Sequence, residues 1–251
     1  MRRHATPIGW PRRNLRHYRF AMPNAVWEYK LKPVEFIIFS YLCYHRPSGT
    51  FTPEVIATDV HMTTSTVKKY LEALMDRGLV TAERSLALDV QCITSEKFFT
   101  LPNEVFLLQL PPSAFMVYSY LLLIEDRRTH NCHPSYNTIS AVTGVSKNTA
   151  MKSIGTLLEM GLITAESSSY FDKRGMKWNG NNLYTILPVR AAMDAFNQRQ
   201  LHQLELDTER RRVLRRQAEY DRCHPRAALC APDSAPAAPD PSQQRKPLCA
   251  G

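Results

Sequence analysis

The chain has 251 residues, a hydrophobic fraction of 44% and a formal net charge of +9. This length allows one large domain or two small ones, and the apolar content excludes a chain that is disordered throughout. Six widely spaced cysteines without a secretory signal argue against a disulfide scaffold, and no apolar run reaches the ~20 residues that span a bilayer. We therefore expect a cytoplasmic protein without a membrane partner, and the basic excess favours an anionic one.

The positive charge is concentrated at the two ends of the chain. Residues 1–19 carry six arginines, Arg12 and Arg13 among them, and no acid. Residues 20–189 carry 15 basic and 15 acidic side chains, and residues 190–226 carry nine arginines against six acids. A neutral body thus lies between a basic arm and a basic C-terminal segment.

An internal repeat organises the neutral body. Residues 20–42 align without gaps on 99–121 with ten identities, and residues 56–83 align on 139–166 with nine. Both copies of the second block end on Gly-Leu and Thr-Ala-Glu. Ungapped self-similarity of this kind predicts two copies of one structural module.

Each copy has the pattern of three helices followed by strands. The predicted helices are residues 34–45, 53–60 and 64–77 in the first copy, and 113–126, 134–143 and 146–160 in the second. The first helix of each copy is apolar nearly all round, as a buried helix should be, and Gly78 and Gly161 end the third helices. The second copy continues into a hairpin with turns at 172–175 and 179–182 and a return strand at 183–187.

A tight turn between the second and third helices, followed by a β-hairpin, indicates a winged helix-turn-helix. We expect a mainly α fold with small β wings: a tandem winged helix-turn-helix repeat, a C-terminal helix without a sustained heptad, and a disordered Ala/Pro-rich tail. The predicted divisions are an arm at 1–19, modules at 20–98 and 99–189, a helix at 190–224 and a tail at 225–251.

A helix-turn-helix reads DNA with the first turns of its third helix. The polar candidates at this position in the two copies are Thr64, Ser65, Lys68, Lys69, Ser146, Lys147, Asn148, Thr149, Lys152 and Ser153. Asn148 has the amide that pairs bidentately with adenine, and the lysines can reach guanine or phosphate. Ser146 and Thr149 lie where a helix N-terminus binds phosphate.

The wing and the arm supply further candidates. The second wing carries Lys173, Arg174 and Lys177 against one acid, so we expect the second copy to make more backbone contacts than the first. Arg12 and Arg13 of the arm suit a minor groove or the phosphates. The alternatives are a solvated hairpin tip and a solubilising tail.

No catalytic motif is present, and we expect neither an enzyme nor a cofactor or small-molecule ligand. His130, Cys132 and His133 lie close together, but their spacing matches no common zinc motif, so we predict no metal site. The adjacent Glu125 and Asp126 are predicted to lie in an exposed charged loop.

The second copy resembles a known group of proteins. Its Phe-Phe-Thr-Leu-Pro-Asn lead-in at 98–103, His-Pro-Ser-Tyr at 133–136 and Gly-Leu-Ile at 161–163 are similar to helix-turn-helix proteins of Gram-positive plasmids and integrative elements, related to the N-terminal domain of replication initiator A. The resemblance covers about 98–188, and 18–97 more loosely. It implies a recognition helix at 146–160, a wing at 167–184 and a bacterial protein associated with the nucleoid or a plasmid. Gly155, in the middle of that helix, departs from the pattern.

The sequence thus predicts a sequence-specific double-stranded DNA-binding protein that regulates transcription or initiates replication of a mobile element. Sequence does not separate the two roles, and either one can involve replication or transcription proteins as partners. The alternative function is a winged-helix protein–protein interaction module, which the neutral body favours.

Overall fold

A computed structural model describes residues 19–45, 52–82, 88–90, 97–171 and 173–223. The chain divides into two compact units, Met1–Arg199 and Gln200–Gly251. The arm candidates Arg12 and Arg13 and the predicted tail lie outside the described residues, so the interpretations of both stay predictions.

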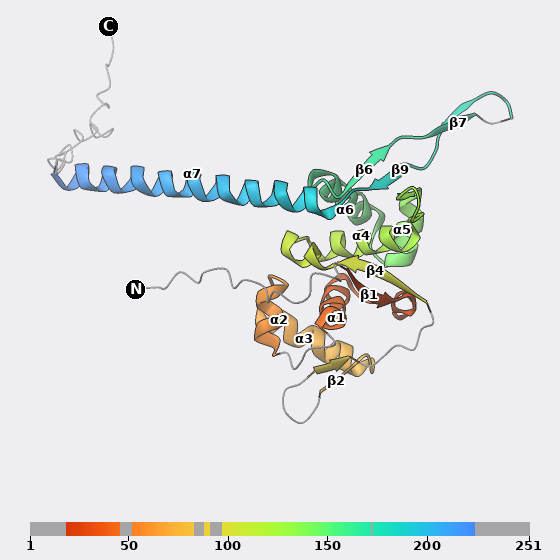
Figure 1. The fold of residues 1–251 in the computed structure, drawn as a ribbon, viewed down its shortest axis with the longest axis horizontal. Coiled ribbons are helices and arrows are strands. Elements are labelled where there is room, and N and C mark those ends of the chain that lie inside the picture. Colours follow the sequence, from red (N-terminus) through yellow and green to blue (C-terminus); the bar gives the residue numbers. More distant parts are fainter. Residues whose placement is uncertain (1–18, 46–51, 83–87, 91–96, 172, 224–251) are drawn as a thin grey trace, which may run out of the picture. The chain divides into compact units, whose positions relative to one another are not determined.

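The first half of the larger unit holds a short strand, a 3-10 helix, three α-helices and two more strands (Figure 1). These elements are β1 (Arg19–Pro23), η1 (Asn24–Tyr29), α1 (Pro33–His45), α2 (Pro53–Asp59), α3 (Thr64–Asp76), β2 (Val80–Ala82) and β3 (Leu88–Val90). Strands β2 and β3 pair antiparallel and form the first wing.

The second half shows the same order of elements with additional strands. Its elements are β4 (Phe98–Pro102), η2 (Asn103–Leu108), α4 (Pro112–Ile124), β5 (Asn131–Cys132), α5 (Tyr136–Thr143), α6 (Lys147–Glu159), β6 (Ile163–Glu166), β7 (Ser169–Phe171), β8 (Lys177–Asn179) and β9 (Leu183–Ile186). Strand β9 lies between β5 and β6, and β7 pairs with β8 beyond them. The final helix, α7 (Val189–Cys223), begins in the larger unit and continues into the smaller one.

The prediction of a mainly helical chain with small antiparallel sheets and a winged helix-turn-helix is confirmed. The observed helices begin and end within about two residues of the predicted ones, as is usual for helix ends. That the two halves are copies of one module stays a prediction. None of the described helices is both long and apolar enough to cross a membrane.

Side-chain caps place the helices of each helix-turn-helix. The hydroxyls of Thr63 and Ser146 accept hydrogen bonds from the backbone N–H groups three residues later and begin α3 and α6. The tight turns before these helices contain a residue with positive φ, His61 at 55° and Gly144 at 72°. Glycine adopts this conformation without strain, whereas a side chain such as that of histidine rarely does.

Helices α1 and α4 form the centre of the core. They are apolar on every side, and Phe36 and Phe115 are fully buried. Strands β1 and β4 form a separate two-stranded antiparallel sheet that joins the two halves. None of the strands β1, β4 and β5 was predicted from the sequence.

Gly155 lies inside α6 with helical backbone angles, and a Cβ there would meet no atom within 4 Å. Gly155→Ala should therefore raise the free energy of unfolding by about 1 kcal/mol, because alanine loses less backbone entropy in a helix. Urea denaturation measures this change. Gly161→Ala is the matched control: its Cβ also has free space, but its φ of 70° should make the variant less stable. Equal effects of the two substitutions would contradict this explanation.

A buried carboxylate links α1 to the end of α3. The Glu35 side chain is 2% exposed; its Oε2 accepts a hydrogen bond from the Lys32 backbone N–H at 2.9 Å and lies 3.4 Å from Arg77 Nη2. Arg77 also donates through Nη1 to the Tyr29 carbonyl at 2.9 Å. The internal repeat aligns these two charged residues with Ala114 and Met160. The first half thus uses an ion pair where the second half has apolar side chains.

Arg77→Met should destabilise the protein by about 1–3 kcal/mol, because a buried carboxylate loses its charged partner. The double variant Glu35→Ala/Arg77→Met reproduces the residues of the second half and should recover most of that loss. Thermal or urea unfolding of both variants measures this coupling. If the double variant is as unstable as the sum of the two single variants, the pair is not coupled as described.

Candidate nucleic-acid interface

The first turns of α6 form a polar, basic surface. Ser146 Oγ accepts from the Thr149 backbone N–H at 3.1 Å, and the two hydroxyl oxygens lie 2.8 Å apart. The side chains of Lys147, Asn148 and Lys152 are exposed, and the first turn contains no acid. Free backbone N–H groups, the helix dipole and Lys147 therefore all favour a phosphate at this end.

The structure corrects one predicted contact on this helix. Ser153 is 3% exposed and lies on the core side of α6 together with Ala150, Ile154 and Leu157. The spacing of these residues is helical, so the periodicity that located the core was sufficient to assign Ser153 to it, and the prediction of Ser153 as a DNA contact was wrong. The exposed face instead includes Met151, which is 47% exposed and which sequence analysis did not select.

The first turns of α3 differ from those of α6 in charge. Thr64 is half-buried, whereas Ser65, Lys68 and Lys69 are exposed. The Lys68 ammonium lies 3.2 Å from a Glu54 carboxylate oxygen on α2. A backbone hydrogen bond to the Glu54 carboxylate, and to a smaller extent Lys68, lowers the pKa of Glu54 below its usual value. An exposed pair of this kind contributes little to stability. It does reduce the positive potential on this face, and no corresponding acid is present in the first turn of α5.

The second wing carries three of the predicted basic residues. Lys173 and Arg174 are exposed in the turn between β7 and β8, and Lys177 begins β8 opposite Phe171. Gly175 completes this turn with a φ of 73°. The structure thus places these residues on one hairpin, as the sequence predicted; whether they contact DNA stays a prediction.

Polar contacts attach the base of this wing to the start of α5. Asn181 Nδ2 donates to the His133 carbonyl at 3.3 Å, and Ser168 Oγ donates to the Asn181 carbonyl. The Gly180 N–H donates to the Ser168 carbonyl at 2.8 Å, and a Cβ at Gly180 would come within 2.3 Å of Ser168 Oγ. A side chain at position 180 would displace the Ser168 hydroxyl and with it the hydrogen bond to the Asn181 carbonyl, which helps to fix the base of the hairpin.

A polar cleft lies where α5, α6 and the wing base meet. Its volume is about 230 Å³, and its lining residues are Pro134, Ser135, Tyr136, Asn137, Lys147, Gly180, Asn181, Asn182 and Tyr184. Asn182 Nδ2 donates to the hydroxyls of Tyr136 and Tyr184 at 3.3 and 3.4 Å, which holds the two rings in place. Lys147 is the cationic side chain in this lining, so the cleft extends the polar surface of α6 toward the wing.

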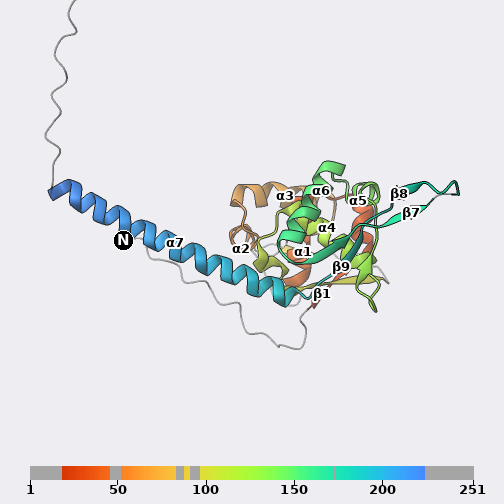
Figure 2. The same ribbon diagram turned by 90° about the horizontal axis from the view of Figure 1, so that it is seen from above.

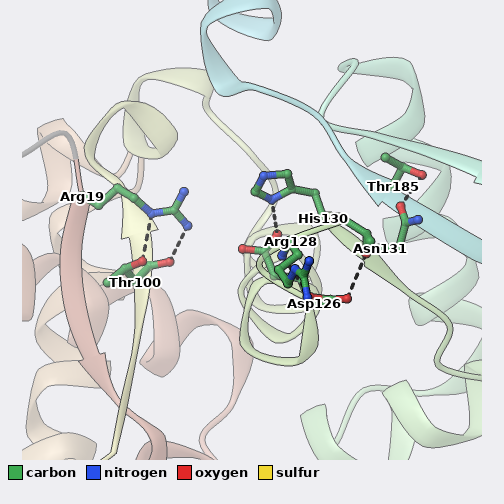
Figure 3. Close-up of polar contacts among 9 residues, drawn as sticks. Arg19, Thr100, Asp126, Arg128, His130, Asn131 and Thr185 are labelled. Atoms are coloured by element: carbon green, nitrogen blue, oxygen red, sulfur yellow. Dashed lines mark hydrogen bonds and ion pairs between the residues drawn. The ribbon is translucent and has the colours of Figure 1, made fainter.

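The residues after α4 form a structured loop rather than a freely solvated one (Figure 3). Asp126 accepts hydrogen bonds through its carboxylate from the Arg128 N–H and the Thr129 hydroxyl, and His130 Nδ1 lies 3.4 Å from Glu125 Oε2. The Glu125 side chain is only 9% exposed, which corrects the expectation of an exposed charged pair.

Cys132 does not belong to an exposed ligand cluster. It is 3% exposed in β5, and burial, with a smaller effect of Glu125, raises the pKa of its thiol to about 12. Within the ranges that the structure describes, no three His, Cys, Asp or Glu side chains are close enough together to hold a metal ion. Cys43 is partly buried against the core.

Arg19 does not belong to the basic arm in which the sequence placed it. It is the first residue of β1. Its Nε donates to the Thr100 hydroxyl and its Nη2 to the Thr100 carbonyl, both at 2.9 Å, as Figure 3 shows. Arg19 is therefore a contact between the two halves of the larger unit.

The capped helix α6, the tight turn before it and the antiparallel strands after it define a protein of the winged helix-turn-helix class. A family model described as a helix-turn-helix domain matches residues 108–163, which extend from the end of η2 to the first residue of β6. No curated protein matches the chain.

Several solved structures are similar to parts of the chain. A possible transcriptional regulator from Methanosarcina mazei Go1 is 17% identical over 41% of this chain and 80% of its own, with a TM-score of 0.29. DIP2311 from Corynebacterium diphtheriae is 16% identical over 61% of this chain and 26% of its own, with a TM-score of 0.20. ScpB from Mycobacterium tuberculosis is 17% identical over 62% of this chain and 92% of its own, with a TM-score of 0.19.

Proposed function

We propose that this chain is a sequence-specific double-stranded DNA-binding protein with two winged helix-turn-helix modules, which regulates transcription or initiates replication of a mobile element. The observation that carries the proposal is the capped N-terminus of α6. It presents Lys147, Asn148 and Lys152 to solvent without a nearby acid on its first turn. The match of residues 108–163 to a helix-turn-helix domain supports DNA as the partner of this surface.

The contacts divide into base reading and backbone binding. Asn148 is the second residue of α6, and its side chain is exposed. Its side-chain amide has both the N–H donor and the carbonyl acceptor that read the major-groove edge of adenine. Lys147, at the polar cleft, and Lys173 and Arg174, in the wing turn, suit phosphates. Because Lys68 is already paired with Glu54, we expect the second module to contribute more of the backbone contacts than the first.

A regulator and an initiator bind DNA with the same surfaces, so they differ in where the bound site lies. A site within a promoter supports regulation, and a site within an origin supports initiation. Chromatin immunoprecipitation of the full chain in its host separates the two. A protein–protein interaction module is the alternative function, and it predicts no retention of any duplex.

The variant Lys147→Ala/Asn148→Ala should lose sequence preference while it still binds DNA of any sequence. A bidentate amide–adenine contact contributes about 1–3 kcal/mol, so the ratio of affinities for selected and random duplexes should fall roughly 5- to 150-fold. Fluorescence anisotropy with both duplexes measures this ratio. Asn197→Ala, on the exposed part of α7 within the same unit, is the matched control. If the ratio is unchanged in the double variant, α6 is not the reading helix.

Removal of residues 1–18, which leaves Arg19 in β1, should weaken binding evenly across sequences. The segment carries five arginines, so the slope of log affinity against log salt should decrease in magnitude by up to about 4.5 if each contacts a phosphate. A full-length variant with these arginines changed to glutamine should behave alike, because the effect is one of charge. A slope equal to that of the unmodified chain would show that the arm makes no phosphate contact.

A further inference from the structure

The two halves of the larger unit meet through residues that the internal repeat makes equivalent. In the β1–β4 ladder Ala21 lies opposite Thr100, and the repeat aligns these same two residues with each other. The repeat also aligns Phe20 with Phe99 and Met22 with Leu101. These four residues pair crosswise in the ladder, because Phe20 lies opposite Leu101 and Met22 lies opposite Phe99. An antiparallel pair with this register has a local two-fold axis between its central residues.

Ring contacts in the core follow the same exchange. The rings of Phe20 and Phe106 have centroids 5.7 Å apart, and those of their equivalents, Phe99 and Trp27, are 6.2 Å apart. Phe36 and its own equivalent Phe115 contact each other at 6.1 Å. A contact between two equivalent residues is expected near a two-fold axis, and not in a head-to-tail arrangement.

A third pair of contacts extends this relation to the far ends of α1 and α4. The Tyr41 ring lies 5.7 Å from that of Phe106, and the equivalent Tyr120 ring lies 5.7 Å from that of Trp27. Both pairs have edge-on geometry, with interplanar angles of 83° and 73°. The relation therefore includes the helices that support the two helix-turn-helices, and is not a local feature of one strand pair.

The third helices are attached to this centre in the same way. Helix α1 packs against α3, and α4 packs against α6. Figure 2 shows α3 and α6 on the same side of the larger unit, away from β1. A two-fold axis reverses the part of a helix direction that lies perpendicular to the axis, whereas a translation keeps the whole direction.

We infer that the DNA site of this chain is an imperfect inverted repeat, with one half-site read by α3 and the other by α6 of the same molecule. This inference rests on the proposed DNA-binding function and specifies its substrate. Proteins with a two-fold axis match the two-fold axis of duplex DNA, which relates half-sites of opposite direction. In this chain the axis is intramolecular, so one chain suffices for both half-sites.

The residues on the outer faces of α3 and α6 determine how far the two DNA half-sites differ in sequence. Lys69 and Lys152 are equivalent, and both are exposed. The other equivalent positions on the two faces differ: Thr64 and Lys147, Ser65 and Asn148, and Lys68 and Met151. The half-sites should therefore agree at the base pair nearest the shared lysines and differ where Asn148 faces an adenine.

Selection of bound duplexes from a random pool by the full-length chain tests the inference. We expect two related half-sites in opposite directions. Half-sites in the same direction, or one half-site alone, would overturn the inference and leave the DNA-binding function intact. If no duplex is retained even at about 50 mM salt, where phosphate contacts are strong, the DNA-binding function itself is overturned, and the inference with it.

A variant of α6 provides a second test. Lys147→Thr with Asn148→Ser and Met151→Lys gives α6 the residues that α3 has at these three equivalent positions. Selection with this variant should recover a more symmetric inverted repeat, in which both half-sites match the α3 half-site. The reciprocal variant, Thr64→Lys with Ser65→Asn and Lys68→Met, should give two copies of the other half-site. If either variant selects the same asymmetric site as the unmodified chain, the two helices do not read related half-sites.

Discussion

The pairing of β1 with β4 determines how the larger unit is built. Each strand has the other as its partner in this sheet, so the backbone hydrogen bonds of one half are completed by the other half. Beneath the sheet, Trp27, Phe36, Phe106 and Phe115 bury their rings against one another. Because large apolar surfaces are shared across this boundary, neither half has a complete core alone. The orientation of α3 relative to α6 is thus a property of the core, because α1 packs on α3 and α4 packs on α6.

Sequence located the helices well because their signals are local. The N-cap hydroxyls of Thr63 and Ser146, and Gly161 after α6, are visible in the chain and act within one turn. The pairing of β1 with β4 was not predictable in the same way. Their buried positions alternate, with Phe20 and Met22 facing the core, but a five-residue alternation does not identify a partner about 80 residues away.

The burial of two polar residues, Glu35 and Ser153, was also not predicted from the sequence. Glu35 is charged and fully buried, and nothing in its local sequence indicates that Arg77 lies beside it, since the pair forms only when α1 packs on α3. Ser153 is the opposite case. It stands at helical spacing with Ala150 and Leu157, so periodicity alone was sufficient to assign it to the core.

The division of charge has a physical consequence for DNA recognition. Within residues 20–189 the basic and acidic side chains balance, so in the proposed function long-range attraction to DNA is assigned to the arginine-rich flanks. In the proposed function, specific reading depends on a few exposed side chains on α3 and α6, and the shared core holds these two helices in place. Arg19 marks the boundary between these roles, because it follows the basic arm in sequence but is bound to Thr100 within the folded unit.

The intramolecular two-fold arrangement is tested most directly by counting the chains that bind one selected duplex with both half-sites. Light scattering of the complex at equal concentrations of protein and duplex measures its mass. The intramolecular two-fold arrangement predicts one chain per duplex, with both half-sites protected from hydroxyl radicals in that same complex. Two chains per duplex, each protecting one half-site, would contradict it.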